Sequence, residues 1–72
     1  MSDIQERLQI LLDYWIKHNQ EHEQEFREWA DKGASLSGGV GRQLQEAAAR
    51  MADATNCLER ARQALAKNMG RS

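Results

Sequence analysis

The sequence has no proline, one cysteine and five glycines, and aromatic residues make up only 6% of it. Because proline is absent, the long stretches between the glycines contain no residue that ends or kinks a helix. The single cysteine, Cys57, excludes an intramolecular disulfide and is typical of a reducing compartment. The chain also lacks an apolar run of about 18 residues, and no basic segment precedes an apolar one. We therefore predict a cytoplasmic protein with no membrane partner.

The length of the chain limits it to a single helical-hairpin domain, which we place at 1–72. A chain this short buries only about 60% of the surface that its unfolded form exposes, so its own core gives marginal stability. A disulfide, a metal or a partner chain usually supplies the rest. Because a disulfide is excluded, we expect a partner chain or a metal.

Charge is unevenly distributed along the sequence, although the net charge is only −1. Residues 1–32 carry eight acidic and four basic side chains, whereas residues 33–72 carry three acidic and six basic ones. Opposite charge favours packing of the two halves on each other. Nothing in this distribution favours a polyanion, so we expect no nucleic acid partner.

Two helices are predicted from the stretches without helix breakers. Acidic residues four positions before basic ones support the first helix, as in Asp3 with Arg7 and Glu23 with Arg27. The predicted segments are helix one over about 3–32, a linker over 33–39 and helix two over about 40–68. A short connection makes two long helices antiparallel neighbours, so the predicted fold is an all-α antiparallel two-helix hairpin.

Capping signals mark the predicted helix ends. Ser2 and Gln5 have the spacing of a capping box, in which each side chain reaches the backbone of the other. Gly33 is expected to end the first helix in a left-handed conformation. Either Ser35 or Ser37 can cap the second helix.

Apolar residues recur at heptad spacing along both predicted helices. In helix one the stripe consists of Ile4, Leu8, Leu11, Trp15, His18, His22, Glu25 and Trp29, with a polar middle. In helix two the stripe consists of Val40, Leu44, Ala47, Met51, Ala54, Leu58, Ala61 and Leu65. We expect these two stripes to form the contact between the helices.

Helix one is apolar over more than one face, because further apolar residues flank its stripe: Ile10, Leu12, Tyr14 and Ile16. A lone hairpin would leave part of this surface uncovered. The simplest assembly that covers it is a two-fold homodimer forming a four-helix bundle, since cyclic dimers are the commonest closed assembly. A tetramer is the alternative.

His18 and His22 occupy the middle of the helix-one stripe. Histidines at positions i and i+4 share a helix face and can offer two nitrogens to one zinc, nickel or cobalt ion. Glu25 lies one turn beyond His22, and antiparallel pairing about a turn near residue 36 or 37 places Cys57 close to the level of His18. The candidate metal ligands are therefore His18, His22 and Cys57, with Glu25 as a further candidate.

A purely structural role is the other interpretation of the two histidines. Partly buried imidazoles can form hydrogen bonds with polar side chains of the facing helix. They then fix the register of the helices, as buried polar residues do in coiled coils. For metal binding, the alternative to a ligand set within one hairpin is a dimer axis that gathers four histidines around one ion.

No motif of a known catalytic site matches the chain. The metalloprotease motif His-Glu-x-x-His needs a glutamate directly after the first histidine, where this sequence has Asn19. Di-iron bundles use Glu-x-x-His, but Trp15 and Asn19 stand three positions before the two histidines. A nucleophilic role for Cys57 would need an adjacent base and a pocket, and a two-helix hairpin has no obvious pocket. We therefore predict that the protein is not an enzyme.

The run Leu-Leu-Asp-Tyr-Trp-Ile-Lys-His-Asn-Gln-Glu-His-Glu-Gln-Glu-Phe-Arg-Glu-Trp-Ala, over 11–30, precedes an alanine-rich second helix. It resembles small uncharacterised prokaryotic helical-hairpin proteins that bear a Trp-Ile-x-His-Asn-x-x-His motif. The resemblance implies a compact helical module and draws attention to Trp15, His18, Asn19 and His22. It implies no particular activity.

The predicted function is that of a small oligomeric helical interaction module without catalytic activity. Its partner would be a second copy of the chain or another protein. The alternative is a divalent transition-metal-binding protein that uses His18 and His22, and an enzyme that uses Cys57 is a distant third.

Overall fold

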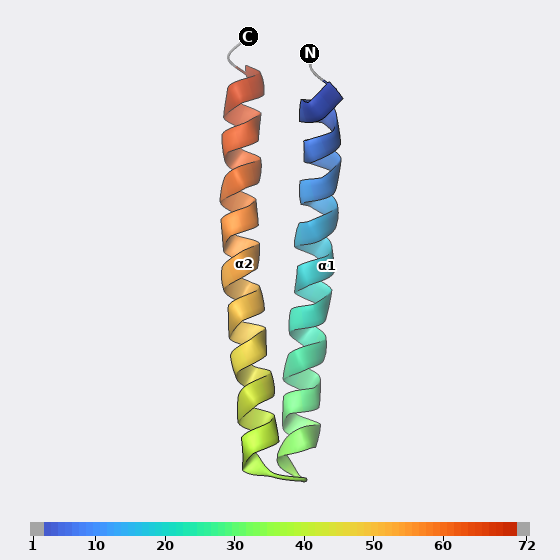
Figure 1. Cartoon of the computed structure of the whole chain (residues 1–72), viewed down its shortest axis with the longest axis vertical. Coiled ribbons are helices and arrows are strands. Elements are labelled where there is room, and N and C mark those ends of the chain that lie inside the picture. Colours follow the sequence, from blue (N-terminus) through green and yellow to red (C-terminus); the bar gives the residue numbers. More distant parts are fainter. Residues whose placement is uncertain (1–2, 71–72) are drawn as a thin grey trace.

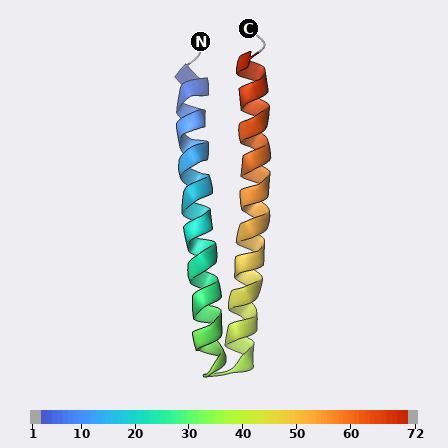
Figure 2. The same ribbon diagram turned by 180° about the vertical axis from the view of Figure 1, so that it is seen from behind.

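The computed structural model describes the backbone of residues 3–70 and the side chains of residues 3–68. It consists of two long helices, α1 (Asp3–Ala34) and α2 (Gly38–Gly70), which run antiparallel and lie side by side along their whole length (Figures 1 and 2). The molecule measures 55 × 15 × 12 Å. The predicted all-α two-helix hairpin is confirmed. Within the described residues, neither helix has a stretch long and apolar enough to cross a membrane.

The turn is shorter than the predicted linker, because residues 35–37 alone separate the helices. Ser37 caps α2: its Oγ accepts a hydrogen bond from the backbone N–H of Val40 at 3.2 Å. Ser35 instead serves the end of α1, where its hydroxyl donates to the Lys32 carbonyl at 2.7 Å. The predicted capping box at Ser2 lies outside the described residues.

Gly33 does not have the left-handed conformation predicted for it. No glycine in the described part of the chain has a positive φ, and Gly33 is a buried residue of α1. A Cβ atom there would lie 2.9 Å from Val40 Cγ1, so the absence of a side chain allows the helices to approach closely. Gly41 has the same role on α2, because a Cβ atom would lie 2.9 Å from the Ala30 carbonyl oxygen.

The contact between the helices, here called the inner seam, consists of buried and half-buried residues at heptad spacing. Its α1 members are Gln5, Leu8, Leu12, Ile16, Asn19, Glu23, Phe26, Ala30 and Gly33, and its α2 members are Gly41, Leu44, Ala48, Met51, Thr55, Leu58 and Leu65. Leu12, Ile16, Ala30 and Ala48 are its buried apolar residues. The inner seam is narrow and contains many small side chains.

The predicted α1 stripe is not the inner seam, which corrects the sequence analysis. Apart from Leu8 and His22, the residues of that stripe are exposed, and Ile4 and Trp29 are 73% and 58% exposed. At 100° per residue, the predicted stripe lies about a quarter turn around α1 from the inner seam. The short turn explains the difference, because it brings the helices together at the small residues Ala30, Gly33 and Ala34.

The predicted α2 stripe is partly correct. Leu44, Met51, Leu58 and Leu65 lie on the inner seam. Of the remaining members, Ala47 is half-buried and Val40, Ala54 and Ala61 are exposed. The close contact between the helices needs small residues one position after Val40 and Ala47. Gly41 and Ala48 occupy these positions and are buried.

Two polar interactions lie at or beside the inner seam. The Thr55 hydroxyl, which is buried, donates to the Met51 carbonyl at 3.0 Å within α2. Arg62 joins the helices by donating to the Asp13 carboxylate at 3.0 Å. This pair links the acidic half of the chain to the basic half, as the charge distribution predicts, although an exposed pair contributes only about 0–1 kcal/mol.

Charged side chains on the outer side of α2 are paired along the helix. Arg50 donates to Glu46 at 2.5 Å and to Asp53 at 3.2 Å. The hydrogen bond with Glu46 raises the pKa of the Arg50 guanidinium above its ordinary value. These charges keep this side of α2 polar.

The close approach at Gly41 makes a prediction about stability. Replacing Gly41 by alanine should lower the free energy of unfolding by about 1–3 kcal/mol, because the new Cβ meets the Ala30 carbonyl oxygen. Gly39→Ala is the matched control, since its Cβ meets only Ser37 Oγ at 3.7 Å. The control should raise stability by up to about 1 kcal/mol, through the higher helix propensity of alanine.

Urea unfolding at one fixed protein concentration, followed by circular dichroism, measures both changes. Equal effects of the two substitutions would contradict the close helix contact.

Candidate functional site

An apolar stripe with two histidines at its centre runs along the outside of α1. We call it the outer stripe, and it consists of Ile4, Leu11, Trp15, His18, His22, Glu25 and Trp29. These positions fall within about 100° of arc on the helix surface. Further exposed apolar side chains, Ile10 and Tyr14, border it. An uncovered apolar surface of this kind marks an interaction site more often than a solvated face.

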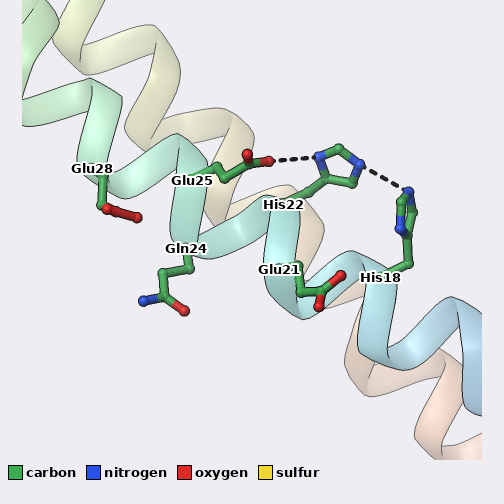
Figure 3. A pocket seen from close by; sticks show the side chains of 6 residues that line it. All are labelled: His18, Glu21, His22, Gln24, Glu25 and Glu28. Atoms are coloured by element: carbon green, nitrogen blue, oxygen red, sulfur yellow. Dashed lines mark hydrogen bonds and ion pairs between the residues drawn. The ribbon is translucent and has the colours of Figure 1, made fainter.

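His18 and His22 project from the same side of α1 and point their rings toward each other (Figure 3). Their Nε2 atoms lie 3.0 Å apart, and the Nδ1 atom of His22 lies 3.3 Å from Glu25 Oε1 (Figure 3). His18 is exposed and His22 is half-buried. The structure therefore brings together three of the four predicted ligands, arranged as a chain from Glu25 through His22 to His18.

Each imidazole also stacks on an aromatic ring of the same helix. Tyr14 stacks on His18 with centroids 5.4 Å apart, and Phe26 stacks on His22 at 5.8 Å. The two imidazoles meet edge to face at 4.4 Å. Each contact joins residues four positions apart, which are neighbours on a helix surface. Tyr14 and Phe26 were not predicted site residues, although their spacing from the histidines is visible in the sequence.

Hydrogen bonding assigns different tautomers to the neutral histidines. An ionised carboxylate can only accept a hydrogen bond, so the contact of 3.3 Å between Glu25 Oε1 and Nδ1 favours the Nδ1–H form of His22. The Nε2 atom of neutral His22 then carries a lone pair and accepts from Nε2–H of His18. A carboxylate behind a histidine is also the usual way in which proteins orient an imidazole toward a metal.

An open depression of about 440 Å³ surrounds the histidines. Its lining is strongly acidic and consists of His18, Glu21, His22, Gln24, Glu25 and Glu28 (Figure 3). Acidic side chains around a shallow site raise the local concentration of cations. Within residues 3–68, however, no three histidine, cysteine or acidic side chains are grouped so as to hold a metal ion.

Cys57 does not join the histidines in the hairpin. It lies two residues after the buried Thr55, which places it about 200° further around α2, on the side away from the inner seam. Its side chain is exposed, and Arg60 donates to its Sγ atom at 3.2 Å. Antiparallel pairing predicts only the level of Cys57 along the hairpin, and neighbouring positions lie about 100° apart around a helix, so Cys57 points away although Leu58 lies on the inner seam.

Comparison with known proteins gives a family but no activity. Residues 8–65 match a family described as a domain of unknown function, DUF8180. A protein of the archaeon Archaeoglobus fulgidus, described as an uncharacterized protein, is 34% identical over 56 residues, which are 78% of this chain and 90% of that protein. No solved structure matches the chain.

The contacts from Glu25 through His22 to His18 predict the tautomers of the two histidines in the absence of metal. His22 should carry its proton on Nδ1 and His18 on Nε2, as measured by nitrogen-15 chemical shifts of the imidazole rings. Glu25→Gln should weaken the preference at His22, because a neutral amide accepts less strongly than a carboxylate. Identical tautomer populations at both histidines would contradict the assignment.

Proposed function

We propose that this chain, which belongs to the DUF8180 family, is a homodimeric helical interaction module in which the outer stripe of one copy packs on that of a second copy. Two hairpins joined in this way form a four-helix bundle. The observation that carries the proposal is the apolar character of the outer stripe beside a sparse inner seam.

The exposed area of the single hairpin supports the proposal. Its accessible surface is 5508 Å², whereas a folded monomer of 8.2 kDa exposes roughly 4500 Å². The excess of about 1000 Å² is close to the roughly 800 Å² that each partner buries in a typical stable interface. The shape agrees, because the radius of gyration is 16.3 Å against about 11 Å for a compact chain of this length.

The side chains on the outer stripe are suited to such a contact. Trp15, Trp29 and the neighbouring Tyr14 are 39%, 58% and 59% exposed, and together they offer on the order of 300 Å² of aromatic surface. Aromatic residues are the usual anchors of protein interfaces. Ile4, Ile10 and Leu11 extend the same surface toward the start of α1.

The inner seam also needs support from a second chain. None of its large side chains is fully buried, and only Leu12 and Ile16 among them are buried rather than half-buried. Burying one aliphatic side chain contributes about 1.5–3 kcal/mol. Ordering a chain of this length costs far more. Folding and association are therefore expected to be coupled.

Divalent transition-metal binding by His18 and His22 is the second candidate function. It is supported by the distance of 3.0 Å between the two Nε2 atoms, because two zinc–nitrogen bonds of 2.0–2.1 Å at a tetrahedral angle hold their nitrogens about 3.3 Å apart. A small rotation of the rings is enough to admit an ion. Calorimetric titration of metal-free protein with zinc tests this candidate.

Assembly through the outer stripe predicts the effect of a charge placed on it. Leu11→Glu should dissociate the dimer, because a desolvated carboxylate at an apolar contact is strongly unfavourable. Gln20→Glu is the matched control, since it adds the same charge to an exposed position on the opposite side of α1. Sedimentation equilibrium at micromolar concentration measures both variants.

The native chain and the control should have twice the mass of one chain. Leu11→Glu should sediment as a monomer with reduced helical content, because folding is coupled to association. A native chain that is a stable, fully helical monomer would contradict the proposed function.

A further inference from the structure

We infer that the two histidine pairs of a dimer bind one divalent transition-metal ion between them, so that His18 and His22 of both copies form a four-imidazole site on the two-fold axis. The inference rests on the proposed homodimer. It adds a ligand, a stoichiometry and a site that neither chain completes alone.

A single hairpin supplies only part of a coordination shell. The pair offers two Nε2 atoms, and tetrahedral zinc needs four ligands. Glu25 is the nearest carboxylate, but its oxygen faces Nδ1 of His22, on the side of the ring away from His18. It therefore orients His22 rather than completing the shell. Further ligands must come from outside the described hairpin.

A two-fold contact between outer stripes supplies these ligands. When two α1 helices run antiparallel with the axis midway between His18 and His22, His18 of one copy faces His22 of the other. The same register sets Leu11 opposite Trp29 and brings Ile4 level with Leu36, which is 83% exposed. One alignment thus pairs four exposed apolar residues, Ile4, Leu11, Trp29 and Leu36, and gathers four imidazoles.

The negative charge around the histidines favours a cation on the two-fold axis. The depression around the histidines is lined by Glu21, Glu25 and Glu28, and the first half of the chain carries eight acidic against four basic side chains. Two such surfaces repel each other when they meet. A divalent cation on the axis offsets this repulsion, so metal binding and dimerisation should strengthen each other.

The bonding change is simple. In the free hairpin, one proton lies between the two Nε2 atoms. When an ion binds, this proton moves by way of water from Nε2 to Nδ1 of His18, with no net release, so that both Nε2 lone pairs face the metal. Because every ligand must be a neutral imidazole, acid should compete with the ion and weaken binding.

The experiment uses the whole chain, freed of metal by a chelator, and titrates it with zinc and cobalt by calorimetry. Conservative variants His18→Gln and His22→Gln keep hydrogen-bonding groups on the helix, and circular dichroism checks that they remain helical. Cys57→Ser is the matched control, because Cys57 lies on the other side of α2. Sedimentation of each protein is measured with and without zinc.

The expected result is one ion per two chains, lost in either histidine variant and kept in Cys57→Ser. Cobalt should give the visible absorption of a tetrahedral ion without a thiolate charge-transfer band. Zinc at about 100 times its Kd should lower the dimer dissociation constant by about a hundredfold. The histidine variants should show no such shift.

Other outcomes overturn the inference and can be told apart from failure of the proposed function. One ion per chain, or no binding tighter than about millimolar, would overturn the shared site while a metal-free dimer leaves the interaction module intact. A chain that stays monomeric with and without zinc would overturn both. A chain that is monomeric in chelator and dimeric with zinc would support the shared site and contradict metal-free association.

Discussion

The close contact beside the turn determines how the rest of the molecule is arranged. Three linker residues leave no room for large side chains, so Ala30 and Ala34 lie against Gly41, and Gly33 lies against Val40. This contact fixes the rotation of α1 about its own axis, because a helix is rigid over its length. The face that bears Trp15 and Trp29 is consequently turned away from α2. An apolar outer surface is thus the direct result of a tight turn.

The sequence predicts the helices, their antiparallel order and Ser37 as one of two alternative caps, because these depend on local signals. It does not predict the rotation of α1, since Leu11 and Leu12 are equally apolar and both belong to acceptable heptad patterns. Which of the two faces contacts α2 depends on the small residues near the turn. A pattern of apolar positions does not take these small residues into account. Cys57 was misplaced for another reason: it precedes the seam residue Leu58, but neighbouring positions lie about 100° apart around a helix.

The candidate site was predictable in part. His18 and His22 share a helix face by spacing alone, and Glu25 follows one turn later. Their surroundings were not predictable, because burial in the hairpin was expected and the structure leaves His18 exposed. That exposure changes the chemistry under consideration. The imidazoles are accessible to an ion and to a second chain, and they lie at the middle of the surface that a second chain would cover.

The central claim is that the outer stripe is the contact between two copies. Isotope-filtered nuclear Overhauser measurements on a dimer of one labelled and one unlabelled chain test it most directly. We expect intermolecular contacts between the Leu11 methyl groups of one copy and the Trp29 ring of the other. Intermolecular contacts confined to the outer side of α2, around Arg50 and Asp53, would contradict the claim.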